Sequence, residues 1–71
     1  MNNNYIMLTT IDNTYIVIRK ESIQLMQEDE FTINNKPMNV TKITLLNNNI
    51  IIVLEDIHDI HTVLQGDVKY I

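Results

Sequence analysis

The chain lacks cysteine, alanine and tryptophan, and its 71 residues include one glycine and one proline. Without cysteine, disulfides, thiolate metal sites and thiol nucleophiles are excluded. A single glycine cannot build a phosphate-binding loop or a dinucleotide-binding fingerprint, because each needs several. So little glycine and proline also argues against a linker, and the sequence predicts one domain over residues 1–71.

Long apolar runs and excess positive charge are lacking as well. The longest apolar stretch, Ile50 to Leu54, is far shorter than a membrane span, and the first residues carry no basic or long apolar region of a secretory signal. Five basic against nine acidic residues give a net charge of −4. This charge opposes non-specific binding to nucleic acid or anionic membrane. The sequence predicts a cytoplasmic protein without direct contact to either.

What is abundant is isoleucine, with thirteen residues, and asparagine, with ten. Isoleucine favours strands, and asparagine suits turns because it tolerates left-handed backbone. An AT-rich genome would give the same bias without structural meaning. As a structural signal, the bias predicts an α+β fold that is mainly β, with antiparallel hairpins forming a small curved sheet or half-open barrel.

Alternating or apolar β-prone segments flank short asparagine-containing turns. Two pairs predict hairpins, and the segment after Phe31 predicts a short hairpin or an ordered loop. Residues 19–22 predict a tight or 3₁₀ turn, and residues 28–30 a solvated acidic corner. The two hairpin pairs are residues 5–11 with 14–18, and residues 39–45 with 50–54.

The pattern changes period after Leu54. Ile57, Ile60, Val63 and Leu64 form one stripe of an amphipathic helix over residues 55–65. Acidic residues at its start suit the helix dipole, and Gly66 stands where a left-handed C-cap is expected. Residues 67–71 would add a last edge strand.

The two halves of the chain resemble each other at an offset of thirty-five residues. Leu8-Thr9 matches Ile43-Thr44, Asn13 matches Asn48, and residues 15–18 match residues 50–53. Chance similarity between two hairpins rich in isoleucine and asparagine explains this match. A duplicated strand–turn–strand unit also explains it.

Residues 6–26 contain, in order, a Leu-Thr strand, an Asn turn, an apolar strand and Glu-Ser-Ile. Residues 40–65 contain Val-Thr-Lys-Ile-Thr-Leu, an Asn turn, Ile-Ile-Val-Leu-Glu and a helix. This order resembles the FlbD-like family of very small proteins. The resemblance implies a compact β fold with a C-terminal helix, and a structural or regulatory accessory role as one possible function. The family's turns usually hold Asn-Gly or Asp-Gly, whereas these turns have no glycine, and residues 28–39 look inserted. A flagellar role does not follow from it.

His58 and His61, three residues apart beside Glu55 and Asp59, would fit a zinc or nickel site or a solvated helix face. No second cluster supplies further ligands, so the solvated face is favoured. The sequence predicts no metal and no cofactor.

The candidate ligand-binding residues are Tyr5, Tyr15, Arg19 and Lys20. The two tyrosines lie in strands expected to pair, so they are expected close together, where they would stack on a nucleotide while the basic residues meet its phosphate. The alternative is that they are half-buried sheet residues with hydrated hydroxyls.

The acidic side chains are candidates for contact with a partner protein. No carboxylate or histidine is placed for acid–base chemistry in a dry pocket, so the sequence predicts no enzyme. The candidate partner-binding residues are Glu28, Asp29, Glu30, Glu55 and Asp59.

Residues 15–18 and 50–54 are apolar at successive positions, so both faces of each strand call for burial. A homo-oligomer, most simply a two-fold dimer, would supply it, and a tight single-chain barrel is the alternative. The predicted function is a small non-enzymatic binding protein of phage or mobile-element type that blocks a host defence protein by stoichiometric binding. The alternatives are an oligomeric sponge that sequesters a nucleotide signalling molecule, and the FlbD-like accessory role.

Overall fold

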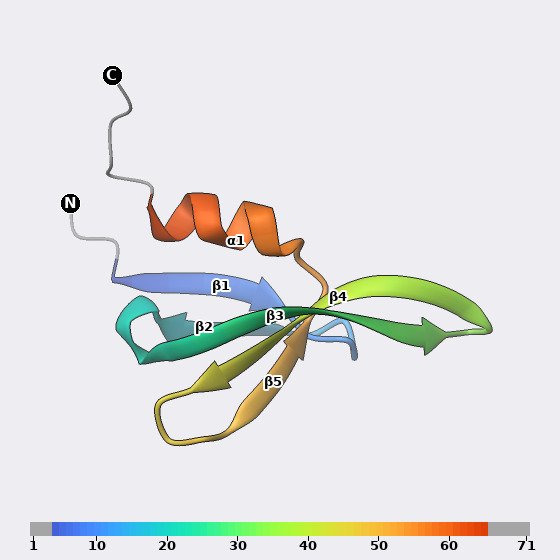
Figure 1. Ribbon diagram of the computed structural model, residues 1–71, viewed down its shortest axis with the longest axis horizontal. Helices are drawn as coiled ribbons and strands as arrows, with labels where there is room; N and C mark the ends of the chain where they lie inside the picture. Colours follow the sequence, from blue (N-terminus) through green and yellow to red (C-terminus); the bar gives the residue numbers. More distant parts are fainter. Residues whose placement is uncertain (1–3, 66–71) are drawn as a thin grey trace.

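The computed structural model describes residues 4–65. Its strands form two antiparallel sheets, β1–β2 and β3–β4–β5, so the fold is α+β and mainly β, as predicted (Figure 1). One isolated bridge, Thr10 to Val53, joins the sheets, and within residues 4–65 they do not close into a barrel. The elements are β1 (Tyr5–Thr9), β2 (Tyr15–Arg19), the 3₁₀ helix η1 (Lys20–Ser22), β3 (Ile23–Ile33), β4 (Lys36–Leu45), β5 (Ile50–Val53) and α1 (Ile57–Leu64).

The β1–β2 hairpin turns through a three-residue loop. The Thr10 N–H donates to the Thr14 carbonyl at 2.8 Å, and the Asn13 N–H donates to the Thr10 carbonyl at 2.8 Å. Asn13 has φ 67°, in the left-handed region. This is the hairpin geometry in which glycine usually takes the left-handed position, and here asparagine takes it.

The β4–β5 hairpin repeats this turn thirty-five residues later. The Leu45 N–H donates to the Asn49 carbonyl and the Asn48 N–H to the Leu45 carbonyl, both at 2.8 Å. Asn48 has φ 69°. Burial follows the same phase, with Leu8 and Ile43 both fully enclosed. The offset found in the sequence therefore corresponds to two hairpins with one local geometry.

The β3–β4 hairpin is longer than expected, and the acidic corner predicted at residues 28–30 is wrong. These residues continue β3, paired with residues 39–41 of β4, up to a two-residue turn with left-handed Asn34 and Asn35. Since β5 pairs only with Thr41 to Thr44, the outer part of this hairpin is a two-stranded ribbon. Charged side chains stay hydrated there, so a strand tolerates them.

The helix closes the core from one side of the strands (Figure 1). It begins at Ile57, with Asp56 as N-cap, whose carboxylate accepts the His58 N–H at 3.0 Å, so the predicted start at Glu55 is wrong. Val63 is 45% exposed, because it lies about 120° around the helix from Ile57. The buried cluster consists of Ile6, Leu8, Ile43, Val53 and Ile60.

Some predictions stay open or hold only in part. Gly66 as C-cap and the strand over residues 67–71 lie outside the described residues. The apolar run from Ile50 to Leu54 was predicted to be buried on both faces of its strand. Val53 is fully buried, but Ile50, which points to the opposite face, is 55% exposed, so only one face is fully buried. No helix within residues 4–65 is long and apolar enough to cross a membrane.

Candidate functional site

The β1–β2 hairpin exposes an apolar surface on the side away from the core. Alternate side chains of each strand point outward, and the register places Met7 opposite Val17 at the centre. Their exposed fractions are 63% and 61%. We call this surface the outer face; it is formed by Tyr5, Met7, Thr9, Tyr15, Val17 and Arg19.

The outer face is large for so small a chain. Tyr5 and Tyr15 are 59% and 73% exposed. An aromatic side chain offers roughly 150–250 Å², so the two rings together leave on the order of 250 Å² open. With Met7 and Val17, the exposed area reaches on the order of 500 Å², comparable to the largest patch of a typical monomer, which is often functional.

Three of the four predicted ligand-binding residues share the outer face, but they do not form one cluster. Tyr5 lies opposite Arg19, and Tyr15 lies opposite Thr9. Four residue steps separate the two tyrosines along the sheet, about 13 Å at roughly 3.3 Å per residue. The expectation that they lie close is wrong, because antiparallel pairing puts the start of β1 beside the end of β2.

The basic end of the outer face is held by local contacts. The Arg19 guanidinium is paired with the Glu21 carboxylate, and the Ser22 hydroxyl donates to the Arg19 carbonyl at 2.6 Å. Lys20 leaves the face at the start of η1, and its Nζ donates to the Val63 carbonyl at 3.4 Å. Arg19 is therefore the basic side chain of the outer face, and it lies beside Tyr5.

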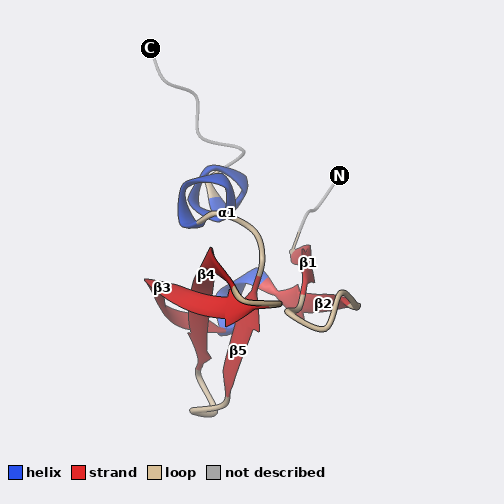
Figure 2. Ribbon diagram, turned by 90° about the vertical axis from the view of Figure 1, so that its right-hand side faces the viewer, coloured by secondary structure: helices blue, strands red, loops and turns tan. Residues whose placement is uncertain are grey.

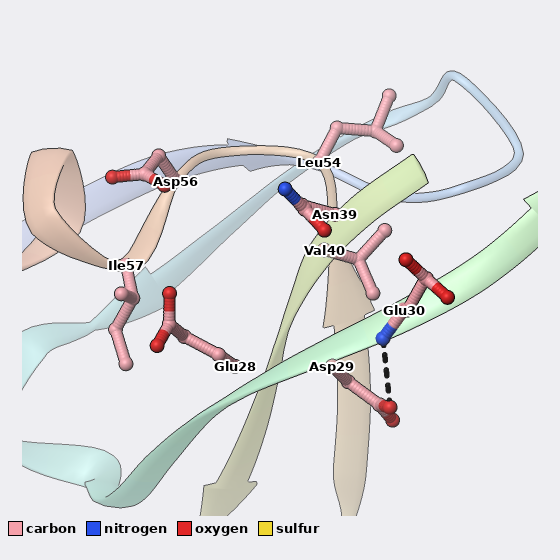
Figure 3. Close-up of a pocket in the computed structure, with 8 residues that line it drawn as sticks. All are labelled: Glu28, Asp29, Glu30, Asn39, Val40, Leu54, Asp56 and Ile57. Atoms are coloured by element: carbon pink, nitrogen blue, oxygen red, sulfur yellow. Dashed lines mark hydrogen bonds between the residues drawn. The ribbon is translucent and has the colours of Figure 1, made fainter. Parts of the chain in front are cut away.

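A second surface is a groove of about 470 Å³ between the β3–β4 hairpin and the segment that leads into α1. Figure 3 shows Glu28 and Glu30 rising from β3 on the side of Asp56 and Leu54, with Asp29 directed away. We call it the acidic groove; its lining is Glu28, Asp29, Glu30, Asn39, Val40, Leu54, Asp56 and Ile57.

The acidic groove favours positive charge but not proton transfer. Its four carboxylates belong to exposed residues, and two of them already serve the backbone: Asp29 accepts the Glu30 N–H at 2.8 Å, and Asp56 caps α1. An acid–base pair needs groups held in a partly dry site, and solvated carboxylates do not provide one. Asp59, another predicted partner contact, is exposed on α1 outside the groove.

Glu55, also predicted to contact a partner, has an internal role. Its carboxylate accepts the Thr9 N–H at 2.9 and 3.0 Å and the Thr9 hydroxyl at 2.9 Å. Its carbonyl accepts the Thr41 hydroxyl at 2.7 Å, and the neighbouring Leu54 N–H donates to the Thr9 carbonyl at 2.8 Å. These bonds fasten the two sheets where they meet, a role that no local sequence pattern indicates.

The histidines stand on the open side of α1. His58 and His61 are both exposed, and residues 4–65 hold no group of three or more side chains placed to bind a metal ion.

Comparison with protein-family models, with curated proteins and with solved structures finds no match. The resemblance to the FlbD-like family stays a prediction.

Sequence reasoning missed Met7 and Val17 as surface residues. Both stand in runs of apolar residues, and such runs are typical of strands buried on both faces. The signal that identifies them is the hairpin itself: its even-numbered residues take the core face, which leaves Met7 and Val17 outside.

Proposed function

We propose that the chain is a non-enzymatic binding protein that acts by covering a surface of another protein with the outer face of its β1–β2 hairpin. One observation carries the proposal: the hairpin presents Tyr5, Met7, Tyr15 and Val17 to solvent, although an antiparallel sheet covered on one side usually turns polar residues outward. An exposed apolar patch of this size is often functional.

Binding rather than catalysis is supported by the acidic groove. This concave surface is lined by four carboxylates, and all four are solvated. A protein that acts by stoichiometric contact needs only complementary shape and charge. The groove adds negative charge, which would speed association with a basic partner surface.

The partner is proposed to be a host protein, blocked by a small protein of phage or mobile-element type. This part of the proposal is supported by the small size of the chain, its charge of −4 and its lack of catalytic motifs. A large host assembly as partner would instead favour the accessory role that the FlbD-like resemblance implies.

A nucleotide sponge is the second candidate, favoured by the shared exposure of Tyr5, Arg19 and Tyr15 on one face. Within one copy the two rings lie at opposite ends of an open surface, which does not enclose a small ligand. A protein partner fits the outer face better, since extended flat surfaces are typical of protein interfaces.

The test compares the wild-type chain with a Met7→Thr/Val17→Thr double variant as immobilised bait in lysates of host cells. Leu46→Thr is the matched control, because Leu46 is 63% exposed, as Met7 is, but lies in the β4–β5 turn. Captured proteins are identified by mass spectrometry, purified and mixed with the chain, and the complex mass is measured by light scattering.

The proposal expects a complex of fixed stoichiometry that the control forms normally and the double variant does not. Capture that is equal for all three chains would contradict the role of the outer face. Heat stabilisation by a panel of cyclic and linear nucleotides, with no protein complex, would replace the proposal with the sponge.

A further inference from the structure

The outer edge of β2 is open and has the hydrogen-bonding groups of a sheet without a partner. Within the part of the chain that the structure describes, β2 forms a strand ladder only with β1. Figure 2 shows the hairpin set apart from the other three strands, on the right of the view. We propose that this edge pairs with the same edge of a second copy, forming a two-fold dimer with a continuous four-stranded sheet.

The hairpin register determines which backbone groups are free. The bonds from the Thr10 N–H to the Thr14 carbonyl and from the Lys20 N–H to the Asn4 carbonyl mark the hydrogen-bonded positions at both ends of the ladder. Such positions alternate along an antiparallel pair, so Ile16 and Ile18 bond to β1. The backbone groups of residues 15 and 17 and the N–H of Arg19 therefore point to the open edge, whereas the Arg19 carbonyl already accepts the Ser22 hydroxyl at 2.6 Å.

A two-fold axis at Val17 satisfies these groups symmetrically. Each Val17 then exchanges both hydrogen bonds with Val17 of the second copy, and Tyr15 pairs with Arg19 of the second copy. On the core side, Ile16 meets Ile18 of the second copy. Facing positions thus combine aromatic with cation and aliphatic with aliphatic, which are favourable cross-strand pairs.

This register also brings Tyr5, Arg19 and a Tyr15 side by side, which one copy alone does not do. Tyr5 already lies opposite Arg19 across the hairpin. The second copy places its Tyr15 on the other side of Arg19, so that the guanidinium lies between two rings drawn from two chains. The two outer faces become one surface around a Val17–Val17 centre.

A second copy fits this edge because β2 carries few of the features that prevent strand pairing, and its charged residue, Arg19, lies at its end. From Tyr15 to Ile18 it has no proline, no lysine and no bulge, the usual means of protecting an edge strand. The contact is small, on the order of 500 Å² per copy, against about 800 Å² in a standard interface. The dimer is therefore expected to dissociate on dilution.

The test uses the untagged full chain alone, in sedimentation equilibrium from about micromolar to millimolar concentration. Val17→Pro removes an N–H that points away from β1, so it spares the hairpin ladder while deleting two symmetry-related bonds of the dimer. We expect the dissociation constant to rise about tenfold or more. Val17→Lys, which keeps the N–H but opposes two charges at the axis, is the second variant in case the proline perturbs folding.

The absence of native cysteine allows a test of the register. A chain with Val17→Cys should be joined to a dimer by a short bismaleimide, whereas Met7→Cys, on the same face but one strand away from the axis, should react much more slowly. A monomer at millimolar concentration, a dimer unaffected by both Val17 variants, or faster joining at position 7 would each overturn the proposal. None of these results bears on binding to another protein, which is measured separately with the bait variants.

Discussion

The β1–β2 and β4–β5 hairpins share a turn geometry and a burial phase, yet their outward sides differ. At the positions equivalent to Met7 and Val17, the second hairpin has Lys42 and Ile52, and both are half-buried within a three-stranded sheet. The first hairpin keeps apolar residues there although nothing in the described chain covers them. The shared side of the two hairpins builds the core, and the side that differs is the better indicator of function.

The largest loss of stability should come from substitutions on the core-facing side that the two hairpins share. Leu8→Ala and Ile43→Ala remove equivalent, fully buried side chains, so each should lower the free energy of unfolding by about 3 kcal/mol, measured by urea denaturation. If one substitution cost less than about 1 kcal/mol, the two hairpins would not contribute equally to the core. Leu8→Val and Ile43→Val provide a milder pair should the alanine variants fail to fold.

The next largest effect should come from the contact of Glu55 with Thr9, which joins the two hairpins. Glu55→Ala deletes the acceptor of the Thr9 N–H and hydroxyl, and hydrogen bonds to a charged group contribute about 1.5–3 kcal/mol, so we expect a loss of about 2 kcal/mol. Glu28→Ala, at an exposed carboxylate of β3, should change stability by less than about 0.5 kcal/mol. Equal effects of the two substitutions would show that the Thr9 contact does not hold the sheets together.

Substitutions at Asn13 and Asn48 test whether the two hairpin turns depend in the same way on left-handed backbone. Asn13→Ala and Asn48→Ala should each cost about 1 kcal/mol, because the short polar side chain of asparagine tolerates left-handed backbone better than the methyl group of alanine does. Asn13→Gly and Asn48→Gly should be as stable as the wild type or more so, since glycine adopts this conformation freely. Thermal unfolding of the four variants measures this. A glycine variant that behaves like the alanine one would mean that the asparagine side chain, not its backbone, is what the turn requires.

The sequence predicted what local pattern controls: the strands of the two hairpins, the turns at Asn13 and Asn48, the 3₁₀ turn and a C-terminal helix. It failed where pairing over distance decides. The residues from Glu28 to Glu30 look like a loop by composition, but their partners in β4 keep them extended. The apolar run of β2 looks doubly buried, but a two-stranded hairpin has one core face.

The candidate site follows the same division. The tyrosines and Arg19 were identified from residue type, and their common face follows from strand alternation. Their separation depends on the hairpin register, and the internal role of Glu55 depends on contact with β1, forty-six residues away in sequence. Neither is encoded in any short segment.

The smallest effect, and the one that separates the two hairpins most clearly, concerns their outer positions. Val17→Thr should change the free energy of unfolding by less than about 0.5 kcal/mol at concentrations where the chain is monomeric, because the side chain is 61% exposed. Ile52→Thr, at the equivalent half-buried position, should cost about 1 kcal/mol, as burial of its larger apolar surface is lost. Chemical denaturation of dilute protein measures both. If Val17→Thr proved as costly as Ile52→Thr, the apolar outer face would serve the stability of the monomer, and its exposure would no longer argue for a partner.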